Sequence, residues 1–164
     1  MKSGLKVRVD KANDVLAALK AIGRKDVLIG IPEESSGRED IPFGNAGIGY
    51  INENGSPAQN IPARPHLQPG VRSVQDETTQ KLKEAAQAVL AGNQAAADRA
   101  LEQAGTIASN AVKRYITITG FTPLADNTIS ARLRRGRTGD KPLIDSGQYR
   151  RAITSIVRSK NAKS

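Results

Sequence analysis

The first third of the chain predicts a short strand, a helix and a second strand. Residues 5–9 alternate apolar and charged side chains, which is typical of a half-buried strand. Residues 11–22 carry apolar side chains at helical spacing, and Gly23 stands where a C-terminal cap belongs. Residues 26–31 form an apolar run that ends at Pro32, so they predict the second strand.

The next segment predicts two loops on either side of a third strand. Residues 33–45 are polar, and because the segment is long we expect a mobile loop. The alternation of apolar residues over 47–53 favours a strand. Residues 54–65 hold three prolines and predict another loop.

From residue 71 the apolar spacing becomes helical. Steps of three and four residues over 71–90, and again over 94–116, predict two long helices. Gly92 and Asn93 interrupt the pattern, so the two helices would form an antiparallel hairpin. Many apolar positions of the second helix are alanines, which would let it approach a neighbour closely.

The C-terminal third predicts smaller elements. We expect a short helix over 126–133, a turn over 142–147, a strand over 153–157 and a frayed basic tail over 158–164. Together the elements predict an α+β fold, with a small antiparallel or mixed sheet packed against a long helical hairpin. Neither an internal repeat nor a clear boundary divides the chain, so residues 1–164 are expected to form a single domain.

Composition narrows the range of functions. The chain has 164 residues, no cysteine and a net charge of +9. Without cysteine there is no disulfide, Cys-based metal site or thiol nucleophile. The basic balance predicts an acidic partner, either nucleic acid or an anionic protein surface. The lean aliphatic content fits either a small core with a helical arm or a subunit that buries surface against copies of itself.

The candidate catalytic and binding motifs do not predict an enzyme. The glycine-rich residues 44–49 lack the strand–loop–helix context of a phosphate-binding loop, which favours a flexible loop before a strand. His66 is the only histidine and has no visible nucleophile, carboxylate or metal-ligand partner, so a packing or surface role is favoured. The acidic pairs at 33–34 and 39–40 are expected to be solvated loop charges. We therefore expect no metal and no cofactor.

Positive charge is concentrated near the C-terminus. Over residues 130–164, ten basic residues accompany only two acidic ones. The densest run is too charged and too broken by glycine to be core, and consists of Arg132, Arg134, Arg135 and Arg137. We expect these arginines to contact either duplex DNA, without sequence specificity, or an acidic neighbouring protein. No segment reaches the roughly 18 apolar residues of a membrane span, so no membrane partner is expected.

Two motif segments carry a family resemblance. The first covers residues 50–57 (Tyr-Ile-Asn-Glu-Asn-Gly-Ser-Pro) and 61–69 (Ile-Pro-Ala-Arg-Pro-His-Leu-Gln-Pro), and the second begins at residue 142 (Pro-Leu-Ile-Asp-Ser-Gly). In order and spacing they resemble the neck and tail-completion proteins of long-tailed double-stranded DNA bacteriophages. That family includes the minor tail protein Z of lambda-like phages. Asn54 and His66 stand where the family usually has an aromatic residue.

The resemblance implies a virion structural protein rather than an enzyme. It would join or finish the head-proximal end of the tail, through which DNA passes, after assembly in the host cytoplasm. The implied partners are copies of itself in a ring, expected to be a hexamer, neighbouring neck, head-closure, tail-terminator or tail-tube proteins, and duplex DNA in the channel. A free, sequence-independent DNA-binding protein is the alternative.

The matching motif residues are expected to be structural, and they are Pro62, Arg64, Pro65, Leu143, Asp145 and Gly147. The prolines would stiffen the approach to the following helix. Arg64 could fix a carboxylate or backbone carbonyls with two hydrogen bonds. Asp145 and Gly147 would form a tight turn, with Asp145 accepting from backbone amides two residues on.

Overall fold

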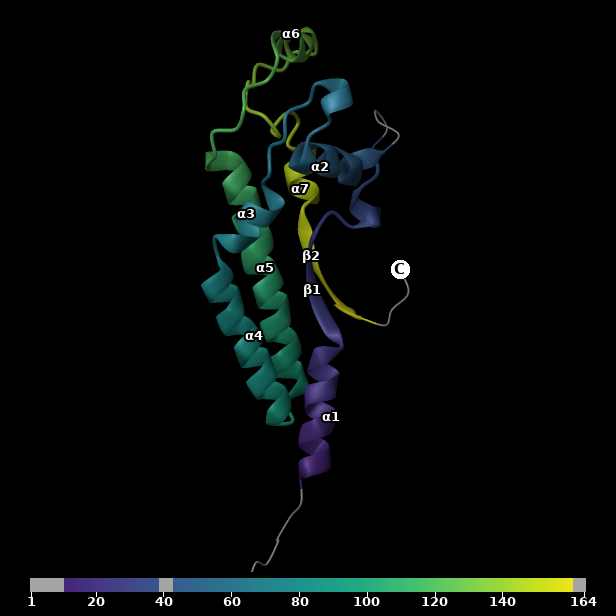
Figure 1. The fold of residues 1–164 in the computed structure, drawn as a ribbon, viewed down its shortest axis with the longest axis vertical. Coiled ribbons are helices and arrows are strands. Elements are labelled where there is room, and N and C mark those ends of the chain that lie inside the picture. The colour runs from purple at the N-terminus through teal and green to yellow at the C-terminus, as the bar shows by residue number, and fades with distance from the viewer. Residues whose placement is uncertain (1–10, 39–42, 161–164) are drawn as a thin grey trace, which may run out of the picture.

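A computed structural model describes residues 11–38 and 43–160, most of which are helical (Figure 1). The helices and strands are α1 (Ala12–Gly23), β1 (Lys25–Gly30), α2 (Gly44–Asn54), α3 (Leu67–Arg72), α4 (Gln75–Leu90), α5 (Gln94–Ile118), α6 (Asp126–Arg134), α7 (Gln148–Ala152) and β2 (Thr154–Ser159). Single 3-10 turns lie at Glu33–Ser35 and Pro57–Gln59. The predicted α+β class is confirmed, because the long helix α5 packs on a small antiparallel sheet.

The helical hairpin of α4 and α5 turns where the sequence predicted. Gly92 adopts a φ of 74°, a left-handed conformation that favours glycine. Asn93 then caps α5, because its side-chain oxygen accepts a hydrogen bond from the Ala96 amide at 3.0 Å. These two residues reverse the chain within a short connection.

Small side chains on α5 bring its neighbours close. A Cβ added to Gly105 would lie 2.6 Å from the Ser155 hydroxyl of β2, so the sheet rests against the helix backbone. Two turns further along α5, a Cβ added to Gly70 of α3 would lie 2.7 Å from the Val112 Cα. The alanine-rich helix therefore packs at close range, as expected.

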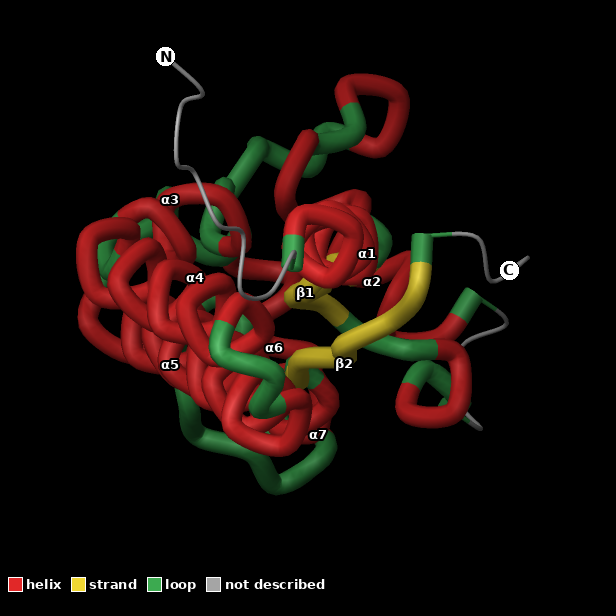
Figure 2. The backbone as a smooth tube through the Cα atoms, turned by 90° about the horizontal axis from the view of Figure 1, so that it is seen from below, coloured by secondary structure: helices red, strands yellow, loops and turns green. Residues whose placement is uncertain are grey.

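The sheet consists of β1 and β2 alone within the described residues, and it lies beside the layer of α4 and α5 (Figure 2). Val27 and Val157 are opposite each other and face the hairpin core. Leu28 and Ile156 form the next pair, on the other face of the sheet, and are 39% and 41% exposed. One face of the sheet is thus covered by helices and the other is open.

Two apolar clusters follow α5 along its length. Near its start, Ala97 and Leu101 pack with Ala85 and Val89 of α4. Near its end, Val112 and Ile116 pack with residues that lead from α7 into β2, namely Tyr149 and Ile153. The single helix α5 therefore links both ends of the core.

The predicted strand over residues 47–53 is wrong, because this segment is the helix α2. The flexible-loop interpretation of residues 44–49 is wrong for the same reason. Tertiary contacts outweigh the low helix propensity of the glycines. Ser36 binds the start of the helix, since its carbonyl accepts from the Asn45 amide at 2.7 Å and its hydroxyl from the Ala46 amide at 3.0 Å. Gly49 also packs closely, because a Cβ there would approach the Tyr149 hydroxyl to 3.0 Å and the tyrosine would have to shift.

Smaller differences concern element boundaries. The helix predicted over 71–90 is interrupted between α3 and α4, and the Ser73 hydroxyl donates to the Gly70 carbonyl at this bend. The helix α7 precedes the predicted C-terminal strand. The expectation that the tail is frayed from residue 158 onward is wrong for residues 158 and 159, because they belong to β2.

Several expectations lie wholly or partly outside the described residues. These are the strand over residues 5–9, part of the loop over 33–45, the acidic pair at 39–40 and the last residues of the tail. Glu33 and Glu34 are exposed, as expected of solvated charges. No helix in the described ranges has the length and apolarity needed to cross a membrane.

Candidate functional site

Arg64 of the first motif ties two loops together. Its side chain is 6% exposed, with Nε donating to the Thr122 carbonyl at 2.9 Å and Nη2 to the Pro123 carbonyl at 3.0 Å. Burial lowers the pKa of the guanidinium. Of the two kinds of partner expected for Arg64, a carboxylate or backbone carbonyls, the structure shows the backbone carbonyls.

Glu53 organises the start of α3 from the last turn of α2. Its carboxylate accepts hydrogen bonds from the backbone amides of His66 at 2.7 Å, Leu67 at 2.9 Å and Gln68 at 3.2 Å. These amides have no partner inside the helix, so the carboxylate serves as a cap supplied by a distant residue. The sequence analysis missed Glu53, because no local spacing connects it to residue 66.

His66 is completely buried and makes hydrogen bonds through both ring nitrogens. Nδ1 lies 2.8 Å from the Arg64 carbonyl and 3.1 Å from the Glu53 carboxylate, and Nε2 is hydrogen-bonded to the Tyr149 hydroxyl. Of the packing or surface placement expected for His66, the structure shows the packed one. Its expected lack of a carboxylate partner is wrong, since Glu53 is in contact with it.

The ionisation of this group follows from burial and hydrogen bonding. Burial lowers the pKa of His66, although the Arg64 carbonyl and Glu53 oppose the shift. Burial alone would raise the pKa of Glu53, but the three amides and His66 lower it overall. Burial and the Glu53 charge both raise the pKa of Tyr149. At neutral pH an ionised Glu53 therefore lies beside a neutral imidazole and a neutral phenol.

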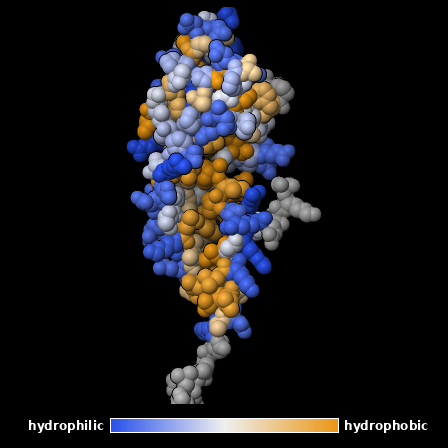
Figure 3. Space-filling view, viewed as in Figure 1, coloured by the Kyte–Doolittle hydropathy of each residue, from blue (hydrophilic) through white to orange (hydrophobic). Residues whose placement is uncertain are grey.

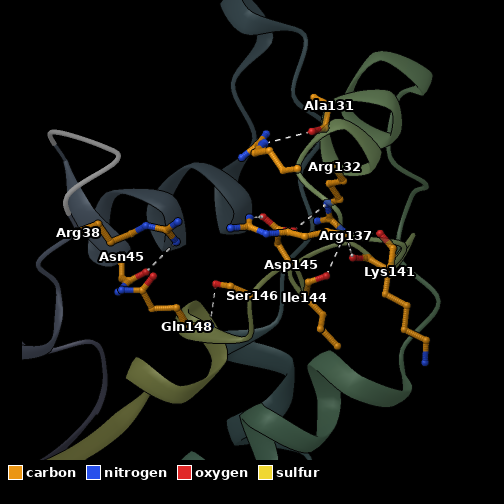
Figure 4. Close-up of polar contacts among 12 residues, drawn as sticks. Arg38, Asn45, Ala131, Arg132, Arg137, Lys141, Ile144, Asp145, Ser146 and Gln148 are labelled. Atoms are coloured by element: carbon orange, nitrogen blue, oxygen red, sulfur yellow. Dashed lines mark hydrogen bonds and ion pairs between the residues drawn. The ribbon is translucent and has the colours of Figure 1, made fainter.

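Arg132 holds the second motif from the inside, as Figure 4 shows. Its Nη1 donates to the carbonyls of Gly139 at 2.9 Å, Lys141 at 3.0 Å and Ile144 at 3.0 Å. Arg132 as a whole is only 7% exposed. The expectation that the arginine run stays out of the core is therefore wrong for this residue. The reason is that the loop after α6 presents carbonyls which regular structure does not satisfy.

The remaining arginines of the run differ in their surroundings. Arg137 is paired with the Asp145 carboxylate, whose other oxygen lies 3.7 Å from Nε of Arg132. Arg134 and Arg135 are exposed on α6 and its C-terminal cap. Among the four predicted contact residues, the structure leaves these two most accessible to an acidic partner.

The predicted turn at the end of the second motif is present, but the expectation that Asp145 accepts from backbone amides in it is wrong. Gly147 has a φ of 77°, and a Cβ there would lie 3.0 Å from Nη1 of Arg151. The Gln148 amide donates to the Ser146 hydroxyl at 3.3 Å, whereas the Asp145 carboxylate binds arginines. Leu143 also adopts a positive φ, of 63°, while its side chain packs against the apolar cluster near the end of α5.

A cavity of about 670 Å³ opens beside the first motif. Its lining includes Pro62, Arg64, Pro123 and Leu124. Pro62 and Pro65 are both exposed, on either side of the buried Arg64. In the described part of the chain, no group of three or more His, Asp or Glu side chains could hold a metal ion.

An apolar stripe runs along the open side of the molecule, over α1 and the sheet (Figure 3). We define it by five exposed side chains, Val15, Leu16, Leu19, Leu28 and Ile156. No residue of α1 is buried, although one helical face of it is apolar. The helical spacing of residues 11–22 predicted that one face of this helix is apolar, but such a pattern does not show what covers the face.

Comparisons of the chain with protein-family models, with curated proteins and with solved structures find no match.

Proposed function

We propose that this chain is a structural subunit of a bacteriophage neck or tail-completion ring and is not an enzyme. The observation that carries the proposal is the apolar stripe on an elongated subunit whose motif residues act as internal braces. Exposed apolar surface of this kind marks a site of association with protein. The order and spacing of the two motif segments supply the link to the phage family.

The two ends of the molecule suit different partners. The apolar stripe covers α1 and the sheet, and it fits copies of the chain or neighbouring neck, head-closure, tail-terminator or tail-tube proteins. α6 lies at the opposite end, where Arg134 and Arg135 are exposed. We propose that this end faces duplex DNA in the channel or an acidic neighbour in the virion.

A free, sequence-independent DNA-binding protein is the second candidate. The observation that favours it is the placement of Arg134 and Arg135 on a projecting helix. Such a protein would bind duplex DNA as an isolated subunit, with an affinity that falls steeply as salt is raised. A ring subunit would bind weakly alone. Titration of purified chain with duplex DNA at two salt concentrations separates the two candidates.

The decisive experiment is electron microscopy of lysates from a phage that lacks this chain. We expect unjoined heads and tails, or tails with aberrant ends, and restoration of virions when the chain is supplied in trans. Normal virions without the chain would contradict the proposal.

Charge reversal then tests the role of α6. The double substitution Arg134→Glu with Arg135→Glu is expected to reduce infectivity. Lys83→Glu with Arg99→Glu is the matched control, because it changes the net charge equally at exposed positions on the hairpin. Equal infectivity of the two variants would remove the proposed role of the α6 arginines and leave the ring assignment to the lysate experiment.

A further inference from the structure

The two-stranded sheet has backbone groups directed away from it on both edges. The Lys160 amide donates to the Arg24 carbonyl at 2.6 Å, just beyond the pair Lys25 and Ser159. In an antiparallel ladder, this places Lys25 and Ser159 in a pair that is not hydrogen-bonded, and pairs alternate from there. The backbone groups of three residues on each strand therefore point outward, from Lys25, Val27 and Ile29 on β1 and from Ser155, Val157 and Ser159 on β2.

These outward groups have no other hydrogen-bond partner within the described residues. Neither a backbone nor a side-chain hydrogen bond from another described segment reaches them. A two-stranded sheet with both edges open is a template for strand addition. Both strands also carry an exposed apolar side chain at the centre of their open face, Leu28 on β1 and Ile156 on β2.

The charges on the two strands identify the strand that fits. β1 carries Asp26 and also Lys25, which is paired with Asp98 of α5, whereas β2 carries Arg158 and is followed by Lys160. Within one copy, Asp26 lies opposite Arg158 and 3.4 Å from Nζ of Lys160. Pairing β2 with a second β2 would gather the basic residues of both copies at one edge without a carboxylate. Pairing β2 with a second β1 would again place an Asp26 carboxylate opposite Arg158 and near Lys160.

We infer that a second copy of this chain pairs its β1 with the open edge of β2, so that the sheet continues from copy to copy. The same register then recurs across the contact, with Val27 hydrogen-bonded opposite Val157 of the next copy. Because β1 and β2 are antiparallel within a copy, repetition without reversal keeps every new pair antiparallel. A contact between two different edges is heterologous and closes into a ring when the rotation between copies permits.

The inference deepens the proposed function and rests on it for the ring, but its test needs only purified chain. The natural protein has no cysteine, so single cysteines report on one contact alone. We would prepare Leu28→Cys and Ile156→Cys, both on the exposed face of the sheet, and oxidise each variant alone and as a mixture. In the inferred register these two positions face each other in a pair that is not hydrogen-bonded, which suits a disulfide.

The expected result is a disulfide-linked dimer in the mixture and its absence from either variant alone. Two copies of position 28 would be separated by two strand spacings, about 10 Å, which is too far for a disulfide. Dimers from one variant alone would overturn the inference in favour of a two-fold contact. A mixture that stays monomeric at the highest concentration tested would also overturn it. The inference would fail as well if the strand predicted over residues 5–9 were found to occupy the edge of β2.

A proline variant supplies the second measurement. Ser159 is exposed and its amide points to the open edge of β2, so Ser159→Pro removes no hydrogen bond within a copy. We expect this change, placed in the Ile156→Cys chain, to abolish the mixed disulfide, and Ser159→Ala to retain it. Unchanged circular dichroism would show that both variants fold. Retention of the disulfide in the proline variant would overturn the inferred pairing.

The two proposals can fail separately. Mixed disulfides together with normal virions in the absence of the chain would preserve the strand contact and refute the phage role. Unjoined heads and tails in the absence of the chain, with no mixed disulfide, would preserve the phage role and refute this contact.

Discussion

The two halves of the molecule are held together by different interactions. The hairpin half, which consists of α1, α4, the first part of α5 and the sheet, packs through alanine, valine and leucine side chains. The motif half, which consists of α2, α3, α6, α7 and their loops, also encloses charged and polar groups. Of the five polar residues that are buried among residues 11–38 and 43–160, four belong to it, namely Asn45, Arg64, His66 and Arg132.

The difference follows from how each half satisfies its backbone. Helices and paired strands bond their own amides and carbonyls, so the hairpin half can use an apolar core. The loops of the motif half leave carbonyls and helix-terminal amides without regular partners. Arg64 and Arg132 donate to such carbonyls, and Glu53 accepts from such amides. Charged residues inside this half are therefore structural.

The largest expected effect is in the motif half. Arg132→Ala would leave three carbonyls without their donor and should lower the free energy of unfolding by about 3 kcal/mol. Urea denaturation followed by circular dichroism measures the change. Arg134→Ala is the control, because Arg134 lies on the same helix and is exposed, and it should change stability by less than about 0.5 kcal/mol. Equal effects would remove the distinction between the two arginines.

A smaller loss is expected from crowding the hairpin half. Gly105→Ala would bring a methyl group to 2.6 Å from the Ser155 hydroxyl, so β2 must shift away from α5. We expect a loss of about 1–3 kcal/mol in the free energy of unfolding. Gly120→Ala is the control, since a Cβ there meets nothing within 4 Å. If Gly105→Ala left the free energy of unfolding unchanged, the sheet would not be packed tightly against α5.

Acid should weaken the motif half specifically. The folded-state pKa values of His66 and Glu53 are both lowered, so the unfolded chain binds more protons than the folded chain as pH falls. Stability should therefore be complete above the ordinary histidine pKa of about 6.5 and decline below it, with a further decline where carboxylates protonate. Urea titrations at pH 7, 6 and 5 measure the slope. His66→Gln should flatten the slope between pH 7 and 5, and an unchanged slope would contradict this assignment.

The smallest effect on stability, with a large effect on assembly, is expected at the apolar stripe. Leu16→Gln with Leu19→Gln changes two half-exposed side chains on α1 and should alter the free energy of unfolding by less than about 1 kcal/mol. We expect the variant to fail in restoring virions to a phage lacking the chain. Lys20→Gln, also exposed on α1, should restore them. Full restoration by the double variant would show that the stripe on α1 is not an assembly surface.

The hairpin half could be predicted from the sequence because its structure follows local rules. Apolar spacing located α1, β1, α4 and α5, and Gly92 with Asn93 marked the reversal. The helix α2 could not be predicted, because its start is bound by Ser36 and one of its glycines, Gly49, packs against the distant side chain of Tyr149. Those contacts have no local signature, and glycine on its own disfavours a helix.

Parts of the candidate site could be predicted where the residue type alone determines the local contact or the backbone conformation. The two hydrogen bonds of Arg64 and the turn at Gly147 were foreseen from residue type. The burial of Arg132 was not, because nothing in a charged run shows which guanidinium turns inward. The pairing of His66 with Glu53 and Tyr149 joins residues up to 83 positions apart, which a single sequence does not reveal.

The length of α5 gives the subunit a mechanical property. At 25 residues the helix extends about 37 Å, and one apolar cluster packs against each end of it. Because the helix is continuous between the two clusters, it holds them at a fixed separation. In the proposed neck or tail-completion ring, α5 would therefore keep the same distance between the hairpin core and the motif core of every copy.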